Sequence, residues 1–246
     1  SSAHRNTDGV FGYGWASSYD AHLNISTDLE HHPFVSFIDP AGERASFAKL
    51  KDQDAYLAGQ GVHAELVHRG DGSYKLSDWR RRIAYIFDSA GRLTSVTDQN
   101  GEATVLSYSA GHLDTVTEPG GRTLVFTWTG DGAHIASVTD PMGRVRSYTY
   151  DTSGNLATAT DRNNVLSTFT YNSSHELTKV VKGKGGYVQN TYSAHKVTKQ
   201  QVLKTTGAAV RVTTVAYSGS PASAAGGTTT VTGDHGAVTT FPYPNL

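Results

Sequence analysis

The chain lacks cysteine entirely, and its 246 residues contain no run of about 18 consecutive apolar residues. The first absence excludes disulfides, thiol nucleophiles and thiolate metal sites, and the second predicts that no helix spans a membrane. An excess of one charge is also missing, because 21 Lys and Arg balance 22 Asp and Glu. Bulk electrostatics therefore give no reason to expect nucleic acid or an anionic membrane as a partner.

Two further local features restrict the interpretation. The single basic run, Arg80 to Arg82, is interpreted as a solvated strand or turn edge, with an anion or partner contact as the alternative. No signal peptide precedes the opening "SSAHRNTDGVFGYGW", whose polar start runs directly into aromatic residues and glycines. We expect a mature fragment or a piece cut from a longer chain, and the absence of cysteine is compatible with export.

What the sequence has in abundance is an internal repeat of about 21 residues, and such a period decides the fold class. The phrase "FDSAGRLTSVTDQNG" beginning at Phe87 returns as "YDTSGNLATATDRNN" beginning at Tyr150. Aromatic residues that close a strand-like run recur at intervals of 20 to 22 residues, at Phe87, Tyr108, Trp128, Tyr150, Tyr171 and Tyr192. An apolar residue follows a few positions later, at Leu93, Leu113, Ile135, Leu156 and Leu177. We predict that these aromatic residues are structural residues of the repeat.

The connections between strands have a repeated composition of their own. The pattern Asp-x-x-Gly is typical of a type I turn, in which the Asp side chain bonds nearby backbone and Gly closes the turn. It predicts turn-forming roles for Asp88 and Gly91, Asp98 and Gly101, Asp140 and Gly143, and Asp151 and Gly154. An outlying copy runs from Asp39 to Gly42, and variants begin at Glu118 and Asp161.

Each period divides into two strands of about six residues and two short turns, which are common sizes in antiparallel sheets. One strand of each unit alternates cleanly, as in Leu124, Phe126 and Trp128, and is predicted to be half-buried. The partner strand is less regular, because Leu93 and Val96 would point to opposite faces of an ideal strand. Either both faces are partly covered or a bulge resets the register. Glycines and turn signals interrupt every helical window, so the predicted fold is all-β, built from antiparallel hairpins, with an evenly spaced sandwich or meander as the alternative.

The assembled columns, aromatic-Asp-x-x-Gly-Arg/Asn-Leu-x-x-Val-Thr-Asp-x-x-Gly, resemble the YD repeats of the Rhs (rearrangement hotspot) family. Segments upstream, "FGYGWASSYDAHL" and "FVSFIDPAGERASF", also resemble the part that opens shells of this family. The resemblance implies relatives among bacterial polymorphic toxins, the C component of Tc insecticidal toxin complexes, wall-associated bacterial proteins and the animal teneurins. It further implies a β-sheet that curves and spirals into a hollow shell, which encloses a C-terminal toxin or offers an extracellular interaction surface.

On this interpretation the chain has three parts. Residues 1–82 form an N-terminal β segment similar to the start of an Rhs shell, residues 83–195 carry the repeats, and residues 196–246 are a degenerate β continuation rich in Thr and Val. In the last part we predict strands from Val210 to Tyr217 and from Thr228 to Thr232, with a flexible loop from Ser218 to Gly227.

The chain departs from the family pattern in two ways. Five repeats are too few to enclose a cargo, so we expect a sector of a shell wall. The self-cleaving Asp-Pro-x-Gly segment that ends the family's conserved core has its letters at Asp140 to Gly143, but in the middle of the repeats. We therefore predict an ordinary turn there and no autoproteolysis.

Eleven His and 22 acidic residues fall into no metal or catalytic-triad spacing. The adjacent His31 and His32 would project to opposite sides of a strand and are interpreted as loop residues. The repeated acids are interpreted as turn formers and not as a glycosidase pair or calcium ligands. We predict no catalytic residue, no metal site and no cofactor.

The expected function is structural: a non-enzymatic, encapsulating wall segment of a secreted or cell-surface toxin or adhesin. Its expected partners are the rest of a larger Rhs-type chain, copies of itself joined through sheet edges, or a toxin cargo, and not nucleic acid. The alternative is an extracellular recognition or self-assembling module that binds glycan or protein through its aromatic face or open edges. We expect the aromatic ladder to be mainly core.

Overall fold

The computed structural model describes residues 6–27, 33–49, 55–183, 185–219 and 227–243. These residues form strands and turns, and no helix occurs within the described ranges, so the all-β prediction is confirmed. Accordingly, no helix long and apolar enough to cross a membrane is found among them. Two compact units are distinguished, one comprising residues 16–145 and the other residues 1–15 together with 146–246.

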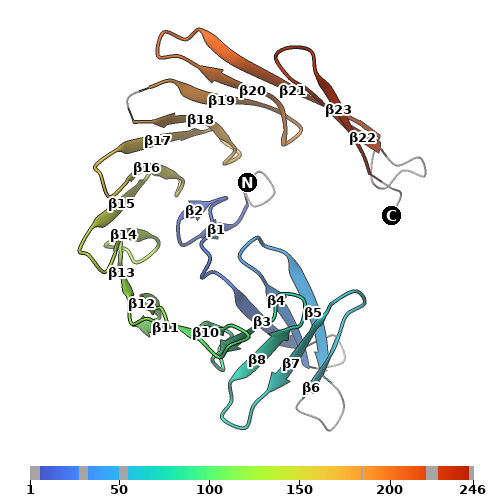
Figure 1. Cartoon of the computed structure of the whole chain (residues 1–246), viewed down its shortest axis with the longest axis vertical. Coiled ribbons are helices and arrows are strands. Elements are labelled where there is room, and N and C mark those ends of the chain that lie inside the picture. Colours follow the sequence, from blue (N-terminus) through green and yellow to red (C-terminus); the bar gives the residue numbers. More distant parts are fainter. Residues whose placement is uncertain (1–5, 28–32, 50–54, 184, 220–226, 244–246) are drawn as a thin grey trace. The chain divides into compact units, whose positions relative to one another are not determined.

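The unit of residues 16–145 is built from consecutive antiparallel strands, each paired with the next along the chain (Figure 1). Short turns connect most of them, as expected for a meander of hairpins. The strands are β3 (His22–Thr27), β4 (Pro33–Ile38), β5 (Arg44–Lys49), β6 (Ala55–Ala58), β7 (Ala64–His68), β8 (Tyr74–Asp78), β9 (Ile83–Phe87), β10 (Leu93–Thr97), β11 (Ala103–Ser109), β12 (His112–Thr117), β13 (Thr123–Trp128) and β14 (Ile135–Thr139).

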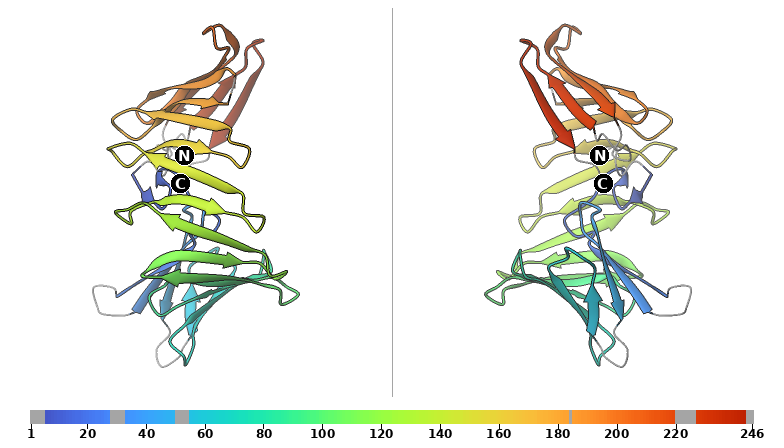
Figure 2. Two further views of the ribbon diagram at one scale, coloured as in Figure 1. Left: turned by 90° about the vertical axis from the view of Figure 1, so that its left-hand side faces the viewer. Right: turned by 90° about the vertical axis from the view of Figure 1, so that its right-hand side faces the viewer.

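The other unit continues the same pattern from the boundary onward. Its strands are β15 (Val145–Tyr150), β16 (Leu156–Thr160), β17 (Leu166–Tyr171), β18 (Leu177–Lys182), β19 (Tyr187–Ser193), β20 (Lys196–Leu203), β21 (Ala209–Gly219), β22 (Gly227–Thr232) and β23 (Val238–Tyr243). Figure 2 shows its yellow and orange strands side by side, with turns along both lateral edges. The short hairpin of β1 (Asp8–Gly9) and β2 (Gly12–Tyr13) also belongs to this unit.

The irregular strand of each repeat contains a β-bulge. Phe87 pairs with Leu93, but the next pair is Ile86 with Ser95, so Thr94 is an extra residue in β10. A bulge of this kind lets two residues of one strand oppose one of its partner and changes which side chains share a face. Of the two explanations left open by the sequence, the bulge is therefore correct. It recurs where the repeat aromatic meets the repeat apolar residue, at Tyr108 and Leu113, Trp128 and Ile135, Tyr150 and Leu156, Tyr171 and Leu177, and Tyr192 and Val197.

The densest core lies in the unit of residues 16–145, where strands β3 to β9 curl so that β4 faces β9. The Phe37 ring of β4 lies 5.3 Å from the Tyr85 ring and 6.0 Å from the Phe87 ring, measured between centroids. Inclined ring pairs of this kind stabilise a core beyond the burial of their area. The largest completely buried side chains here are Phe47, Leu66, Leu76, Phe87 and Leu93.

The C-terminal strands are longer than the sequence suggested. The strand expected from Val210 to Tyr217 extends from Ala209 to Gly219, and Gly227 already begins β22. The ends of the expected loop, Ser218, Gly219 and Gly227, are thus paired strand residues, because a Ser and Gly-rich composition weakens a strand without preventing ladder hydrogen bonds. Residues 220–226 of that loop lie outside the described residues.

Candidate functional site

The acidic side chains of the repeat turns bind backbone N–H groups of their own turns. Oδ1 of Asp88 accepts hydrogen bonds from the backbone N–H groups of Ala90 at 3.0 Å and Arg92 at 2.9 Å, while the Gly91 N–H donates to the Asp88 carbonyl. Gly91 has a φ of 83°, a left-handed conformation that glycine adopts without steric cost. The same carboxylate-to-backbone pattern occurs at Asp39, Asp98, Asp140, Asp151 and Asp161.

In three turns a basic residue at the fifth position binds the acid at the first. Guanidinium-to-carboxylate distances are 2.8 Å for Arg92–Asp88, 2.7 Å for Arg122–Glu118 and 2.7 Å for Arg144–Asp140. The Asp140 segment is therefore folded as a turn like the others. Backbone N–H groups of Glu102 and Asn100 hold the pKa of Asp98 below its usual value. Each acid serves its own turn, and the described residues contain no group of three or more His, Asp or Glu able to hold a metal. His31 and His32 lie outside the described residues.

The repeat aromatics differ in their burial. Phe87 is completely buried, whereas Tyr108, Trp128, Tyr150, Tyr171 and Tyr192 are half-buried. The polar tips of three of them reach the preceding repeat: Tyr108 Oη donates to the Leu93 carbonyl at 2.8 Å, and Tyr192 Oη donates to the Leu177 carbonyl at 2.9 Å. The Nε1–H of Trp128 makes the equivalent bond to Leu113 at 2.9 Å. Burial raises the pKa of Tyr108 and that of Tyr171 to about 12 each.

The carbonyls that accept these hydrogen bonds belong to residues at the bulges. This link between the aromatic residues and the bulges was not predicted from the sequence. Leu93, Leu113 and Leu177 each precede the extra residue of a bulge, and each accepts from the aromatic 15 residues later. A constant offset of 15 between the apolar column and the Tyr or Trp column is the signal that could have revealed it. The bond gives a reason for Tyr or Trp in place of Phe at these positions, because a buried carbonyl needs a donor.

The opening segment covers part of the aromatic face in its own unit. The Phe11 ring meets the Tyr148 ring edge-on at 5.0 Å, and the Trp15 ring meets the Phe169 ring at 5.1 Å. Trp15 Nε1 donates to Tyr171 Oη at 2.7 Å. Between these anchors a Cβ atom on Gly12 would lie 2.5 Å from the Gly154 carbonyl oxygen, so only glycine fits. The aromatic and glycine pattern "FGYGW" is thus a packing segment.

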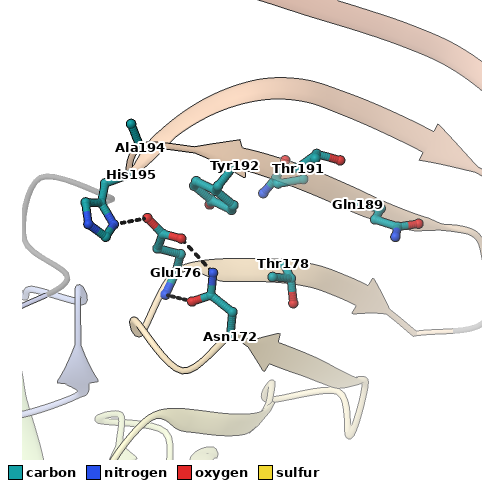
Figure 3. Close-up of a pocket in the computed structure, with 9 residues that line it drawn as sticks. Asn172, Glu176, Thr178, Gln189, Thr191, Tyr192, Ala194 and His195 are labelled. Atoms are coloured by element: carbon teal, nitrogen blue, oxygen red, sulfur yellow. Dashed lines mark hydrogen bonds and ion pairs between the residues drawn. The ribbon is translucent and has the colours of Figure 1, made fainter.

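One turn has a buried acid at its fifth position. Asn172, His175 and Glu176 occupy the positions that hold Asp, Gly and Arg in the first repeat turn. Glu also stands at the fifth position of the turns that begin at Asp39 and Asp98, but Glu43 and Glu102 are exposed. The Glu176 side chain is 4% exposed. Its Oε1 lies 2.9 Å from His195 Nδ1 in the turn between β19 and β20, and its Oε2 accepts from Asn172 Nδ2 at 2.6 Å (Figure 3). This buried carboxylate was not singled out from the sequence, because Glu also occupies the fifth position of other turns, where it is exposed.

Glu176 lies between two pockets. The more enclosed one has a volume of about 270 Å³ and is lined by the Tyr13, Trp15, Tyr171 and Tyr192 rings together with Glu176 and Asn190. The other, of about 380 Å³, shares Glu176, Asn190 and Tyr192 and also borders on His195 (Figure 3). Tyr13 closes one side, since its ring stacks on that of His175 with centroids 3.7 Å apart. Of the three repeat aromatics in this unit, Tyr171 and Tyr192 therefore border on a space instead of filling it.

The basic run has internal partners. Arg81 lies 3.5 Å from the carboxylate of Asp39 and 3.9 Å from that of Asp78. Arg82 donates to Gln99 at 3.3 Å, and Arg80 to Arg82 are exposed in the turn between β8 and β9. This arrangement agrees with a solvated turn edge.

Comparison with known proteins finds a family model that matches the repeats. The family model described as RHS Repeat matches residues 87–123 and 128–165. No curated protein matches the chain. Three solved structures are similar to it: the crystal structure of TcdB2-TccC3-Cdc42, with 11% identity and a TM-score of 0.42; the Photorhabdus luminescens Tc holotoxin pore, with 12% and 0.32; and the crystal structure of TcdB2-TccC3-TEV, with 12% and 0.21.

The alignments with these structures cover 89%, 87% and 90% of this chain, in the same order. The chain spans only 15% of the length of the first two matched chains and 16% of the third. The assignment of fold therefore rests on the strands, bulges and turns of the chain itself.

Proposed function

We propose, because the chain belongs to the RHS-repeat family, that it is a non-enzymatic wall segment of a larger secreted or cell-surface protein. In this role each hairpin supplies the pairing partner of the next, and the repeat aromatics and turn acids are architectural residues. The larger protein would be a toxin or an adhesin, and its remaining chain would continue the sheet.

The observation that carries the proposal is the recurrence of one bulged hairpin. The aromatic, the bulge and the Asp turn return together, as with Phe87, Leu93 and Asp98 in one unit and Tyr150, Leu156 and Asp161 in another. A hairpin of about 21 residues cannot bury its apolar face alone and is stabilised by its neighbours. Hairpins stacked in this way favour an extended wall over a cleft.

The use of the acidic residues also supports a role without catalysis. Catalytic carboxylates have to converge on one substrate, whereas Asp88, Asp98 and Asp140 each bind the backbone of their own turns. A toxin enclosed by the completed wall is the cargo we propose for this family role.

The experiment is electron microscopy of the longest natural chain that contains these residues. We expect a hollow particle with a wall one sheet thick, and no turnover in broad hydrolase and transferase screens. A solid particle with no internal space would contradict the wall, and turnover that disappears in a Glu176→Gln variant would contradict the absence of catalysis.

A second candidate is a recognition or self-assembling module, and two observations favour it. Tyr171 and Tyr192 border on a pocket, and β23 exposes Val238 at 60% and Phe241 at 55%. Exposed apolar side chains favour association with another copy. Sedimentation velocity over a wide concentration range tests this, and a monomer at every concentration would count against self-assembly. A glycan array tests sugar recognition.

A further inference from the structure

We propose that a basic strip on strands β18 to β21, which lie side by side (Figure 2), binds a linear acidic polysaccharide. The strip consists of Lys179, Lys182, Lys199, Lys204 and Arg211. This inference goes beyond the recognition role given above, because it concerns a charged surface and not the aromatic face or the sheet edges that pair. It is independent of the wall role.

The charge of the chain is nearly balanced overall but unevenly distributed along it. Residues 177–246 contain seven Lys and Arg but a single acidic residue, Asp234. Residues 1–176 contain 14 Lys and Arg and 21 Asp and Glu. Such an asymmetry between two parts of a chain indicates interaction with a charged partner. The C-terminal part is therefore the one that favours an anionic ligand.

The cations of the strip are not neutralised within the protein. In the unit of residues 16–145, arginines pair with acids, as do Arg81, Arg92, Arg122 and Arg144. Among the described residues, no member of the strip has an acidic partner. Lys182, Lys204 and Arg211 are exposed, and Lys179 and Lys199 are half-exposed. Unpaired charges within a Debye length of about 10 Å act together on a ligand.

Two lysines of the strip share one face of the sheet with hydrogen-bonding side chains. Lys179 pairs with Gln189 of β19, which pairs with Gln201 of β20. Lys199 lies two residues before Gln201 and pairs with Thr191. Residues paired across strands, and residues two apart along a strand, lie on the same face. The two lysines are two strand spacings and two residues apart, which is about 12 Å, with amide and hydroxyl groups between them.

The opening segment leaves this face uncovered. Trp15 packs on Phe169, and Phe169 pairs with Val180. Val180 is next to Lys179 in β18, and adjacent residues of a strand point to opposite faces. Lys179 therefore points away from the opening segment and from the aromatic residues that it contacts.

The other three cations gather at one lateral edge of the sheet. β18 ends at Lys182, Lys204 directly follows β20, and Arg211 is the third residue of β21. The register brings these positions together, because Tyr187 pairs both with the residue before Lys182 and with the residue before Lys204. The positive surface thus extends from the face to the edge across four strands, and an elongated surface fits a ligand that is itself a chain.

The side chains of the strip distinguish an acidic polysaccharide from other polyanions. Planar, bidentate recognition of phosphate uses Arg, whereas four of the five cations are Lys. Single-stranded nucleic acid stacks its bases on aromatic rings, but the Tyr187 ring lies under Lys179, with Nζ 4.1 Å from its centroid. The side chains of Gln189, Thr191 and Gln201 have no hydrogen-bond partner among the described residues. They are available for the hydroxyl groups that a polysaccharide carries on each ring.

The test is calorimetric titration of the whole chain with heparin oligosaccharides, with dextran oligosaccharides of equal length as the uncharged control. We expect saturable binding of heparin, no binding of dextran, and a loss of about 100-fold in heparin affinity between about 50 and about 200 mM NaCl. The double variant Lys179→Gln, Lys199→Gln should weaken binding about tenfold or more. It should also lower the slope of log affinity against log salt concentration by about one to two.

Two further double variants separate the strip from net charge and from folding. Lys49→Gln, Lys75→Gln makes the same change of net charge in the other unit and should leave the affinity within about twofold of the original. Lys179→Arg, Lys199→Arg keeps both charges and should retain binding within about threefold. Far-ultraviolet circular dichroism checks that each variant is folded. A purely structural role of the lysines would not change the salt slope.

Several results would overturn the proposal. They are no heparin binding at about 50 mM NaCl, equal binding of heparin and dextran, or an equal loss in the Lys49, Lys75 control. Tighter binding of a duplex oligonucleotide or of phosphatidylserine vesicles than of heparin at the same salt would assign the strip to that partner instead. Self-association that disappears at high salt, without heparin binding, would identify the acidic part of another copy as the occupant.

Parallel titrations identify the anionic group of the polysaccharide. Alginate carries only carboxylates and dextran sulfate only sulfates, and binding of either one beside heparin supports the strip as the site. The wall role is read out by particle shape in electron microscopy, so failure of one proposal leaves the other intact.

Discussion

The backbones of Gly91 and Leu23 meet without any side chain between them. The N–H of Leu23 donates to the Gly91 carbonyl at 2.8 Å, and a Cβ atom on Gly91 would lie only 2.2 Å from the Leu23 carbonyl oxygen. A bridge between His22 and Arg92 lies next to this contact. The first repeat turn is therefore hydrogen-bonded directly to β3, the first strand of the unit of residues 16–145.

This contact predicts that two glycines in equivalent turns differ in their tolerance to alanine. Gly91 and Gly101 have φ angles of 83° and 85°, so Ala incurs the left-handed strain of about 1–2 kcal/mol at either position. No atom lies within 4 Å of a Cβ on Gly101, whereas Gly91 faces backbone. We expect Gly101→Ala to lower the free energy of unfolding by about 1 kcal/mol and Gly91→Ala by about 3 kcal/mol or more, measured by urea denaturation. Equal losses would show that the contact with Leu23 can relax.

The hydrogen bond from a repeat tyrosine to a carbonyl at a bulge predicts that removing the tyrosine hydroxyl lowers the free energy of unfolding. Tyr108→Phe keeps the ring but leaves the Leu93 carbonyl without the donor now at 2.8 Å, so we expect a loss of about 1 kcal/mol in unfolding free energy. Tyr148→Phe is the matched control, since Tyr148 is held by the edge contact of its ring with Phe11, which Phe preserves. The same urea titration compares the two, and a larger loss at Tyr148 would argue against the bulge bond as the reason for tyrosine.

The turns and the buried faces of the strands could be predicted from the sequence, because they depend on local chemistry. Asp-x-x-Gly fixes a turn through bonds within five residues, as at Asp88 and Arg92, and alternation fixes the buried face of strands such as β13. The family resemblance also followed from these columns. Whether a bulge or a doubly covered strand explained Leu93 and Val96 could not be decided, because both give the same apolar spacing.

The site depended on contacts between distant residues, which no local pattern specifies. Trp15 and Tyr171 are 156 residues apart, and His195 reaches Glu176 from the next hairpin. Glu at position 176 resembled decay of the repeat. Only the structure shows that Glu176 is buried and bonded to Asn172 and His195, because a buried carboxylate needs hydrogen-bonding partners.

The opening segment predicts that two tryptophans contribute very differently to stability. Trp15 packs on Phe169 and donates to Tyr171, whereas Trp79 is 62% exposed. We expect Trp15→Ala to lower the free energy of unfolding by about 2–3 kcal/mol, below the range for a fully buried ring because Trp15 is half-buried. Trp79→Ala should change it by less than about 0.5 kcal/mol. Denaturation followed by circular dichroism tests both, and a small effect at Trp15 would mean that the segment is detached in solution.

The half-buried tyrosines predict loss of stability at alkaline pH. Burial raises the pKa of Tyr108 and of Tyr171 to about 12, and raises that of Tyr150 as well. In the unfolded chain a tyrosine has a pKa of about 10, so the unfolded state releases its protons first. The stabilising contribution is therefore complete below pH 10 and is lost as the pH rises from about 10 to about 12. Urea midpoints measured across this interval should fall, and the Tyr108→Phe, Tyr171→Phe double variant should show a shallower fall. Phenolate absorbance of the folded protein gives an independent measurement, since a titration in which every tyrosine ionises near pH 10 would show that these rings are not buried against the bulged strands.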